Sequence, residues 1–110
     1  MASTQTTLAS HLFSADRRRT ERNEVTIFTL AALPGQERVE IEIVNVSTGG
    51  VLVYAAQAMM ENSPVHVDMP GLGWVGAKII WYFNERHGLA FNRPLDEDYV
   101  GTLTDLHAND

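Results

Sequence analysis

Cysteine is absent from this chain of 110 residues. The absence excludes disulfide bonds, thiolate metal sites and cysteine nucleophiles, and it is typical of proteins in a reducing compartment. There is also no run of about 18 apolar residues, which a membrane-spanning helix would need. The N-terminal stretch MASTQTTLASHLFSAD lacks the basic start and the long apolar core of a secretory signal. We therefore expect a cytoplasmic protein with no membrane partner.

Basic residues are scarce: 8 Lys and Arg stand against 14 Asp and Glu, for a formal net charge of −6. This balance argues against a protein that coats nucleic acid, so any anion bound should be small and held locally. Half of the basic residues nevertheless fall within DRRRTER, residues 16–22. They form either a solvated basic tail or part of a specific site.

Six short apolar runs predict β-strands. The clearest, ERVEIEIVNV, alternates Val39, Ile41 and Ile43 with glutamates, as in a strand with one buried face. The alternation changes parity at Val44 and Val46, which indicates a bulge or bend. The predicted strands cover residues 25–33, 37–46, 49–55, 64–70, 74–83 and 88–92, and a short helical or irregular crossover is expected at 56–62.

The C-terminal residues 94–106 predict a helix. Acidic residues occupy its first turn, and Gly101 weakens its middle. Its apolar residues recur at helical spacing: Leu95, Tyr99, Leu103 and Leu106.

Strands joined mainly by tight turns favour a closed barrel, because closure removes exposed strand edges. The predicted fold class is all-β: a six-stranded antiparallel β-barrel that one C-terminal α-helix plugs or covers. We expect a mobile N-terminal tail at 1–15, the barrel domain with its helix at 16–106, and a C-terminal tail at 107–110.

The stretch GLGWVG, residues 71–76, matches the G-x-G-x-x-G pattern of dinucleotide-binding proteins. That mechanism needs the third glycine to open a helix whose N-terminus holds the pyrophosphate. Here the strand-like AKIIWYF follows instead. We interpret the stretch as a glycine-rich hairpin turn and predict no cofactor.

Catalytic constellations are also missing from the sequence. Ser47 has no G-x-S-x-G surroundings, and the carboxylates at 96–98 are explained by a first helical turn. We therefore predict neither an enzyme nor a metal site. The histidines at 11, 66, 87 and 107 lack ligand spacing and are expected at the surface or in turns. Met59 and Met60 in the crossover are expected to fill gaps in the packing. The aromatic residues expected in the core or on the barrel surface are Trp74, Trp81, Tyr82 and Phe83.

Two short motifs remain, one before the first predicted strand and one between the second and third. Arg18 and Arg22 form R-x-x-x-R, and Asn45, Ser47 and Gly50 form N-x-S-x-x-G. In this order, separated by one β-hairpin and followed by a small-barrel pattern, they resemble the signature of the PilZ domain family. The resemblance covers residues 16 to 104 and continues in GWVGAKIIWYFNERHGLAFNRPL. It implies a six-stranded antiparallel barrel that binds the bacterial second messenger cyclic di-GMP.

By this resemblance Arg18 and Arg22 are the arginines that bind the nucleotide. A guanidinium can fork onto guanine O6 and N7, clamp a phosphate or stack on a purine, whereas a lysine supplies only charge. Arg17 and Arg19 lie outside the motif and either add steering or are solvated charge.

The resemblance also implies that Asn45 and Ser47 present donors and acceptors to a guanine edge. Gly50 would let the backbone approach closely or adopt a positive φ. Asn45 stands where many family members have aspartate, so its bond to guanine is expected to be weaker. A second interpretation, compatible with the first, is that Asn45 and Ser47 form a local Asx or Ser turn at the hairpin corner.

The function implied is a receptor or adaptor. Residues 10–22 would become ordered around the nucleotide, and the changed surface would signal to a protein partner. One alternative keeps the fold as an interaction module that does not bind nucleotide. Another is a barrel that binds RNA or single-stranded DNA, although the acidic composition disfavours a nucleic-acid partner. The arginines are compatible with one or with two bound cyclic di-GMP molecules.

Overall fold

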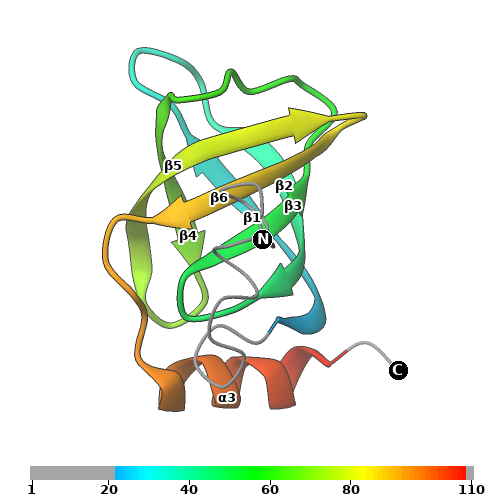
Figure 1. Ribbon diagram of the computed structural model, residues 1–110, viewed down its shortest axis with the longest axis vertical. Helices are drawn as coiled ribbons and strands as arrows, with labels where there is room; N and C mark the ends of the chain where they lie inside the picture. The colour runs from blue at the N-terminus through cyan, green and yellow to red at the C-terminus, as the bar shows by residue number, and fades with distance from the viewer. Residues whose placement is uncertain (1–21, 109–110) are drawn as a thin grey trace, which may run out of the picture.

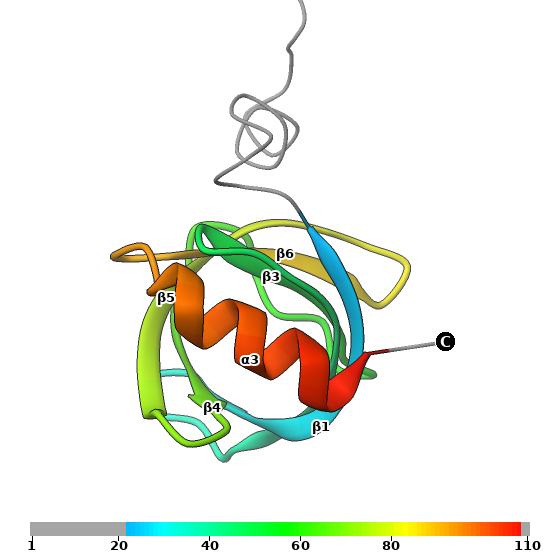
Figure 2. The same cartoon turned by 90° about the horizontal axis from the view of Figure 1, so that it is seen from below.

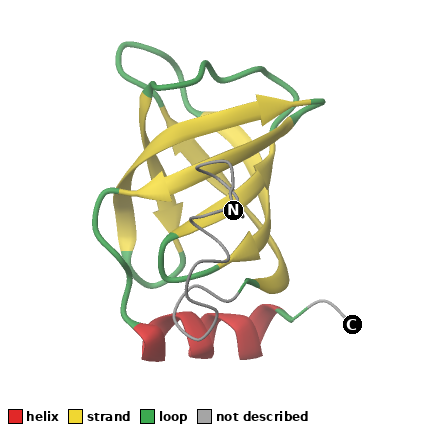
Figure 3. Cartoon of the chain, in the orientation of Figure 1, coloured by secondary structure: helices red, strands yellow, loops and turns green. Residues whose placement is uncertain are grey.

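Six antiparallel strands close into one barrel in the computed structural model, which describes residues 22–108 (Figure 1). The strand order around the barrel is β1-β2-β3-β6-β5-β4. The strands are β1 (Asn23–Ala32), β2 (Val39–Val46), β3 (Gly50–Tyr54), β4 (Pro64–Met69), β5 (Gly73–Phe83) and β6 (Arg86–Phe91), and the helix α3 (Glu97–His107) follows them. The predicted fold class is confirmed, and strands dominate the described chain (Figure 3). The predicted tail at 1–15 lies outside the described residues.

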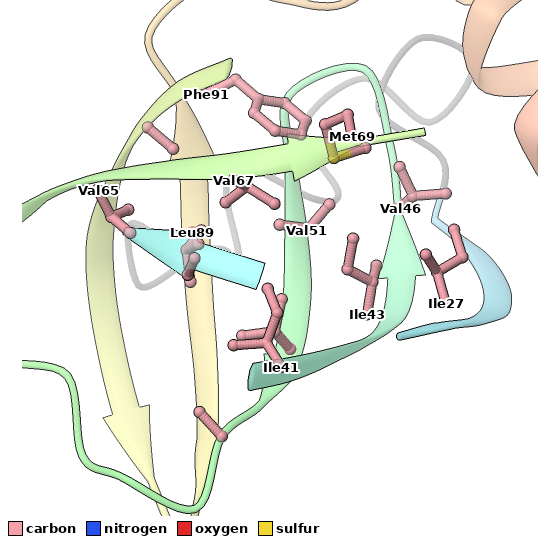
Figure 4. Packing of buried hydrophobic residues seen from close by; sticks show 14 of the residues in the cluster. Ile27, Ile41, Ile43, Val46, Val51, Val65, Val67, Met69, Leu89 and Phe91 are labelled. Atoms are coloured by element: carbon pink, nitrogen blue, oxygen red, sulfur yellow. The ribbon is translucent and has the colours of Figure 1, made fainter. Parts of the chain in front are cut away.

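The strand alternation fills the barrel with apolar side chains. In β2, Val39, Ile41 and Ile43 are buried, while Glu40 and Glu42 lie on the outside. Figure 4 shows the same arrangement from the other strands, whose inward side chains pack together. Burial of each such side chain contributes roughly 1.5–3 kcal/mol, so this interior is the main source of stability.

The change of parity in β2 is a β-bulge, as predicted. The pairing of β2 with β3 shifts between Ile43 and Asn45, and the extra residue is Val44. Val44 and Asn45 are both partly exposed, whereas Val46 returns to the interior. The bulge therefore leaves Asn45 on the outside of the barrel, at the end of β2.

Helix α3 lies across one end of the barrel (Figure 2). It buries Val100 and Leu103 in the common core, so it covers the barrel, as predicted. Tyr99 Oη donates a hydrogen bond of 2.7 Å to the Pro70 carbonyl, and burial raises the pKa of this phenol. Ala108, just beyond the helix, forms a β-bridge with Val25 of β1. Among residues 22–108, no helix is long and apolar enough to cross a bilayer.

The glycine-rich stretch 71–76 lies at the β4–β5 hairpin turn, as predicted: Gly71 and Leu72 are in the turn, and Gly73 begins β5. Gly71 and Gly73 have φ of +76° and +86°, the left-handed region that glycine adopts without strain. Gly76 lies within β5, opposite His66 of β4, and does not open a helix. This geometry removes the dinucleotide interpretation.

The crossover between β3 and β4 is irregular and contains no helix. Met59 is buried in the core, as predicted, but Met60 is exposed. The connection runs across the end of the barrel that is opposite to α3 (Figure 1). The two ends of the barrel are therefore covered by different kinds of structure.

His87 is not the surface or turn residue that the sequence predicted. The β5–β6 turn needs only Asn84 and Glu85, both at positive φ, so strand β6 begins at Arg86 rather than at Gly88. His87 is thereby placed in the strand with its side chain fully buried. Its Nε2 accepts a hydrogen bond of 3.0 Å from the Met59 N–H, and its Nδ1 lies 3.2 Å from the Glu85 carbonyl. The neutral imidazole with a proton on Nδ1 satisfies both contacts.

Acidification is expected to destabilise the protein through His87. Burial lowers the pKa of His87 below its ordinary value of 6.5, although the Glu85 carbonyl acts in the opposite direction. Below pH 6.5 the unfolded chain binds this proton more readily than the folded chain, so stability is lost as the pH falls from 6.5 toward the folded pKa. Urea unfolding at a series of pH values measures this loss. A His87→Gln variant should lose this pH dependence. A His66→Gln variant is the control and should keep it, since His66 is exposed. Equal pH profiles of stability for wild type and His87→Gln would contradict the prediction.

Candidate functional site

The turn between β2 and β3 is held by the side chain of Ser47. Its Oγ accepts hydrogen bonds from the N–H groups of Gly49 (3.2 Å) and Gly50 (3.1 Å), and it donates to the Gly50 carbonyl (3.3 Å). Ser47 is fully buried. Since a hydroxyl has one donor and two acceptor positions, these bonds use its whole capacity. The geometry is the local Ser turn of the second interpretation.

Gly50 begins β3 at the point where β3 meets β6. A Cβ at Gly50 would collide with the backbone carbonyl oxygen of Leu89. Gly50 is not among the glycines with positive φ, so of the two reasons suggested by the sequence only close approach applies. The close neighbour is the β6 backbone.

The same turn is attached to the segment that leads into α3. The Phe91 N–H donates to the Gly49 carbonyl (2.9 Å), and the Leu95 N–H donates to the Thr48 carbonyl (2.8 Å). Backbone groups on both sides of the turn are therefore engaged. We infer a preformed turn, whose position depends on β6 and on the start of α3.

Asn45 stands beside this turn, on the outside of the barrel. Its neighbours in the adjacent strands are Glu24 of β1 and Leu52 of β3. Within the described part of the chain, the side chain of Asn45 makes no hydrogen bond. The Ser47 hydroxyl is fully used within the turn, whereas the N–H donors and the carbonyl acceptor of the Asn45 amide are available to a bound molecule.

Arg22 is brought next to the turn by the register of the first two strands. Asn23, the first residue of β1, pairs with Val46, and its Nδ2 donates to the Val46 carbonyl at 3.4 Å. Arg22 immediately precedes this pair and is exposed. The structure therefore places Arg22, Asn45, Ser47 and Gly50 at one end of the barrel. The other arginines considered, Arg17, Arg18 and Arg19, lie outside the described residues.

Glu24 gives this region a negative charge. Glu24 is exposed and pairs with Asn45 across the two strands. The described part of the site therefore has a carboxylate next to the side-chain amide of Asn45. An anion would be repelled by Glu24 unless guanidinium groups supplied compensating positive charge. Elsewhere in residues 22–108, no three acidic or histidine side chains are grouped in a way that could hold a metal ion.

Comparison with known families gives one match. A family model described as "PilZ domain" matches residues 16–108, nearly the whole chain. No curated protein matches the chain.

Proposed function

The chain belongs to the PilZ domain family, and on this premise we propose that it is a receptor for cyclic di-GMP. The family is known for binding this nucleotide, and its domains are receptors and adaptors. The proposed site comprises Arg18, Arg22, Asn45, Ser47 and Gly50, with Arg17 and Arg19 as auxiliary residues. The observation that carries the proposal is the pairing of Asn23 with Val46, since it brings Arg22 beside a turn that Ser47 already holds in shape.

The residues of the proposed site divide into two roles. Arg18, Arg22 and Asn45 contact the nucleotide: the guanidinium groups bind phosphate and the guanine O6 and N7 atoms, and the amide binds a guanine edge. Ser47 and Gly50 act mainly by shaping the turn, because the Ser47 hydroxyl is already used and Gly50 approaches β6. A direct bond from Ser47 to guanine would require one of its local bonds to be exchanged.

In this proposal, binding is communicated through the start of β1. Residues 10–22 become ordered over the nucleotide, and they lead directly into the start of β1. Val25, near that start, bridges to Ala108 at the end of α3. Ordering of the N-terminal segment would change the surface beside the start of β1, and a protein partner in the cytoplasm recognises the changed surface without any catalytic step.

Replacing either motif arginine is expected to weaken binding of cyclic di-GMP. Arg18→Ala and Arg22→Ala should each cost about 1–3 kcal/mol, a factor of roughly 5 to 150 in affinity, because each removes a charged bidentate contact. Calorimetric titration measures this change, and the melting temperature of the free protein should stay nearly constant.

Arg38→Ala is the matched control for this titration. Arg38 is exposed and lies 5.3 Å from the centroid of the Trp74 ring, at the start of β2 rather than at its end. Its removal changes the net charge by the same amount but should leave affinity nearly unchanged. GTP and cyclic GMP should not compete. If wild-type protein gave no heat with cyclic di-GMP, the receptor function would be rejected, and the chain would be a PilZ domain that acts as an interaction module. A steeply salt-dependent titration with RNA would instead indicate nucleic-acid binding.

A further inference from the structure

Three aromatic side chains and two charged ones form a row across the outside of the barrel. The strand registers pair Phe28 of β1 with Glu42, Glu42 with Tyr54, Tyr54 with Arg86, and Arg86 with Phe83 of β5. Because directly paired residues have Cβ atoms about 4.5–5.5 Å apart, the five side chains are consecutive neighbours. This row runs through β1, β2, β3, β6 and β5, which lie side by side in Figure 1.

The row exposes more aromatic surface than the fold requires. Phe28 is 76% exposed and Phe83 is 70% exposed, whereas Ile27, the residue before Phe28 in β1, is buried. Aromatic side chains are enriched at protein–protein interfaces relative to the rest of the surface, so this exposed row is a candidate interaction surface. Neither phenylalanine packs in the barrel interior, so folding does not explain their presence.

A depression of about 220 Å³ lies between Phe28 and Tyr54, over Glu42. Its rim also includes Glu40 and Glu85. The volume is below the roughly 300–1,000 Å³ that is usual for small-molecule sites, so it fits one inserted side chain better than a cofactor.

The chemistry of the depression specifies the charge of that side chain. Three carboxylates line it, and none of its lining residues is basic. Aromatic faces and carboxylates both attract a cation, and arginine suits them best because its planar group stacks and forks. The row itself contains an example of this contact, since the Arg86 guanidinium lies 5.5 Å from the centroid of the Tyr54 ring.

We propose that this depression receives an arginine side chain from a protein partner, with flanking apolar side chains of the partner covering Phe28. Charge complementarity selects this occupant: the chain carries a net charge of −6 and the depression is acidic. This inference rests on the proposed function in one respect, namely that a receptor needs a protein partner. The depression is distinct from the nucleotide site, because Tyr54 ends β3 whereas Gly50 begins it.

The proposal is tested with a labelled short peptide in which arginine alternates with leucine, titrated by fluorescence anisotropy in the absence of cyclic di-GMP. Glu42→Gln and Phe28→Ala should each weaken binding by about tenfold, since one removes the counter-ion and the other an exposed aromatic anchor. Citrulline in place of arginine keeps the shape of the side chain without the charge, and it should weaken binding to a similar extent.

Two variants away from the depression provide matched controls. Glu97→Gln removes the same charge as Glu42→Gln, and Leu72→Ala removes an exposed apolar side chain from the β4–β5 turn; both should bind the peptide as the wild type does. Equal affinities for all variants, equal binding of the citrulline peptide, or no binding at all would overturn the proposal. The proposal would also be overturned if a peptide of residues 16–22 bound more tightly than the arginine–leucine peptide, because the depression would then receive the arginine segment of this chain. Cyclic di-GMP titration of Phe28→Ala should match wild type, so the two proposals can fail separately.

Discussion

Replacement of Gly50 by alanine is expected to destabilise the fold by about 3 kcal/mol or more, near the upper end of the range for overpacking a close contact. The added Cβ would meet the Leu89 carbonyl oxygen, which belongs to the backbone of β6 and cannot rotate away. Relief requires β3 and β6 to separate, although five residue pairs join them from Gly50 to Tyr54. Urea unfolding of the free protein measures the loss.

Gly101→Ala is the matched control for this substitution. Gly101 lies within α3, is exposed, and has no atom within 4 Å of the position that its Cβ would take. Alanine there should stabilise the protein by about 0.5–1 kcal/mol, because it lowers the entropy of the unfolded chain and favours helix. A Gly50→Ala protein as stable as wild type, but defective in nucleotide binding, would show that Gly50 serves the ligand and not the barrel.

Truncation of His87 to alanine is expected to cost about 3–5 kcal/mol, because a buried ring is lost and a hydrogen bond is broken. The ring stacks on Tyr82 with centroids 5.3 Å apart, and its Nε2 is the acceptor for the Met59 N–H. The Glu85 carbonyl keeps another partner, the Ala55 N–H, so the Met59 N–H is the group left without an acceptor. Thermal and urea unfolding both report this loss.

His87→Gln separates the two contributions. The glutamine carbonyl can accept from the Met59 N–H but cannot stack on Tyr82, so its destabilisation should be smaller than that of His87→Ala. The alanine variant should also expose the 55–63 connection, which amide hydrogen exchange at Met59 would detect. If the two variants were equally stable, the hydrogen bond from the Met59 N–H to His87 would contribute nothing to stability.

The site and the interaction surface differ in how well the sequence indicates them. Asn45, Ser47 and Gly50 stand in a short motif at one hairpin corner, so their proximity follows from chain connectivity alone. Phe28, Tyr54 and Phe83 belong to three separate strands, and their alignment depends on the registers that join β1 to β5 through β2, β3 and β6. No local pattern contains that information.

The alternation of β2, the glycine turn that begins at Gly71 and the spacing of Tyr99 and Leu103 in α3 follow from local rules, since side-chain periodicity and backbone freedom are properties of neighbouring residues. Those rules were enough for the barrel, the bulge and the covering helix. The sequence did not predict the burial of Val100 or the exposure of Leu106. The burial of His87, the contact of Gly50 with Leu89, and the side-by-side placement of Arg22 and the 47–50 turn depend on pairing between distant strands. Only the closed barrel specifies these features, because closure sets every register at once and a shift by one residue would turn each inward side chain outward.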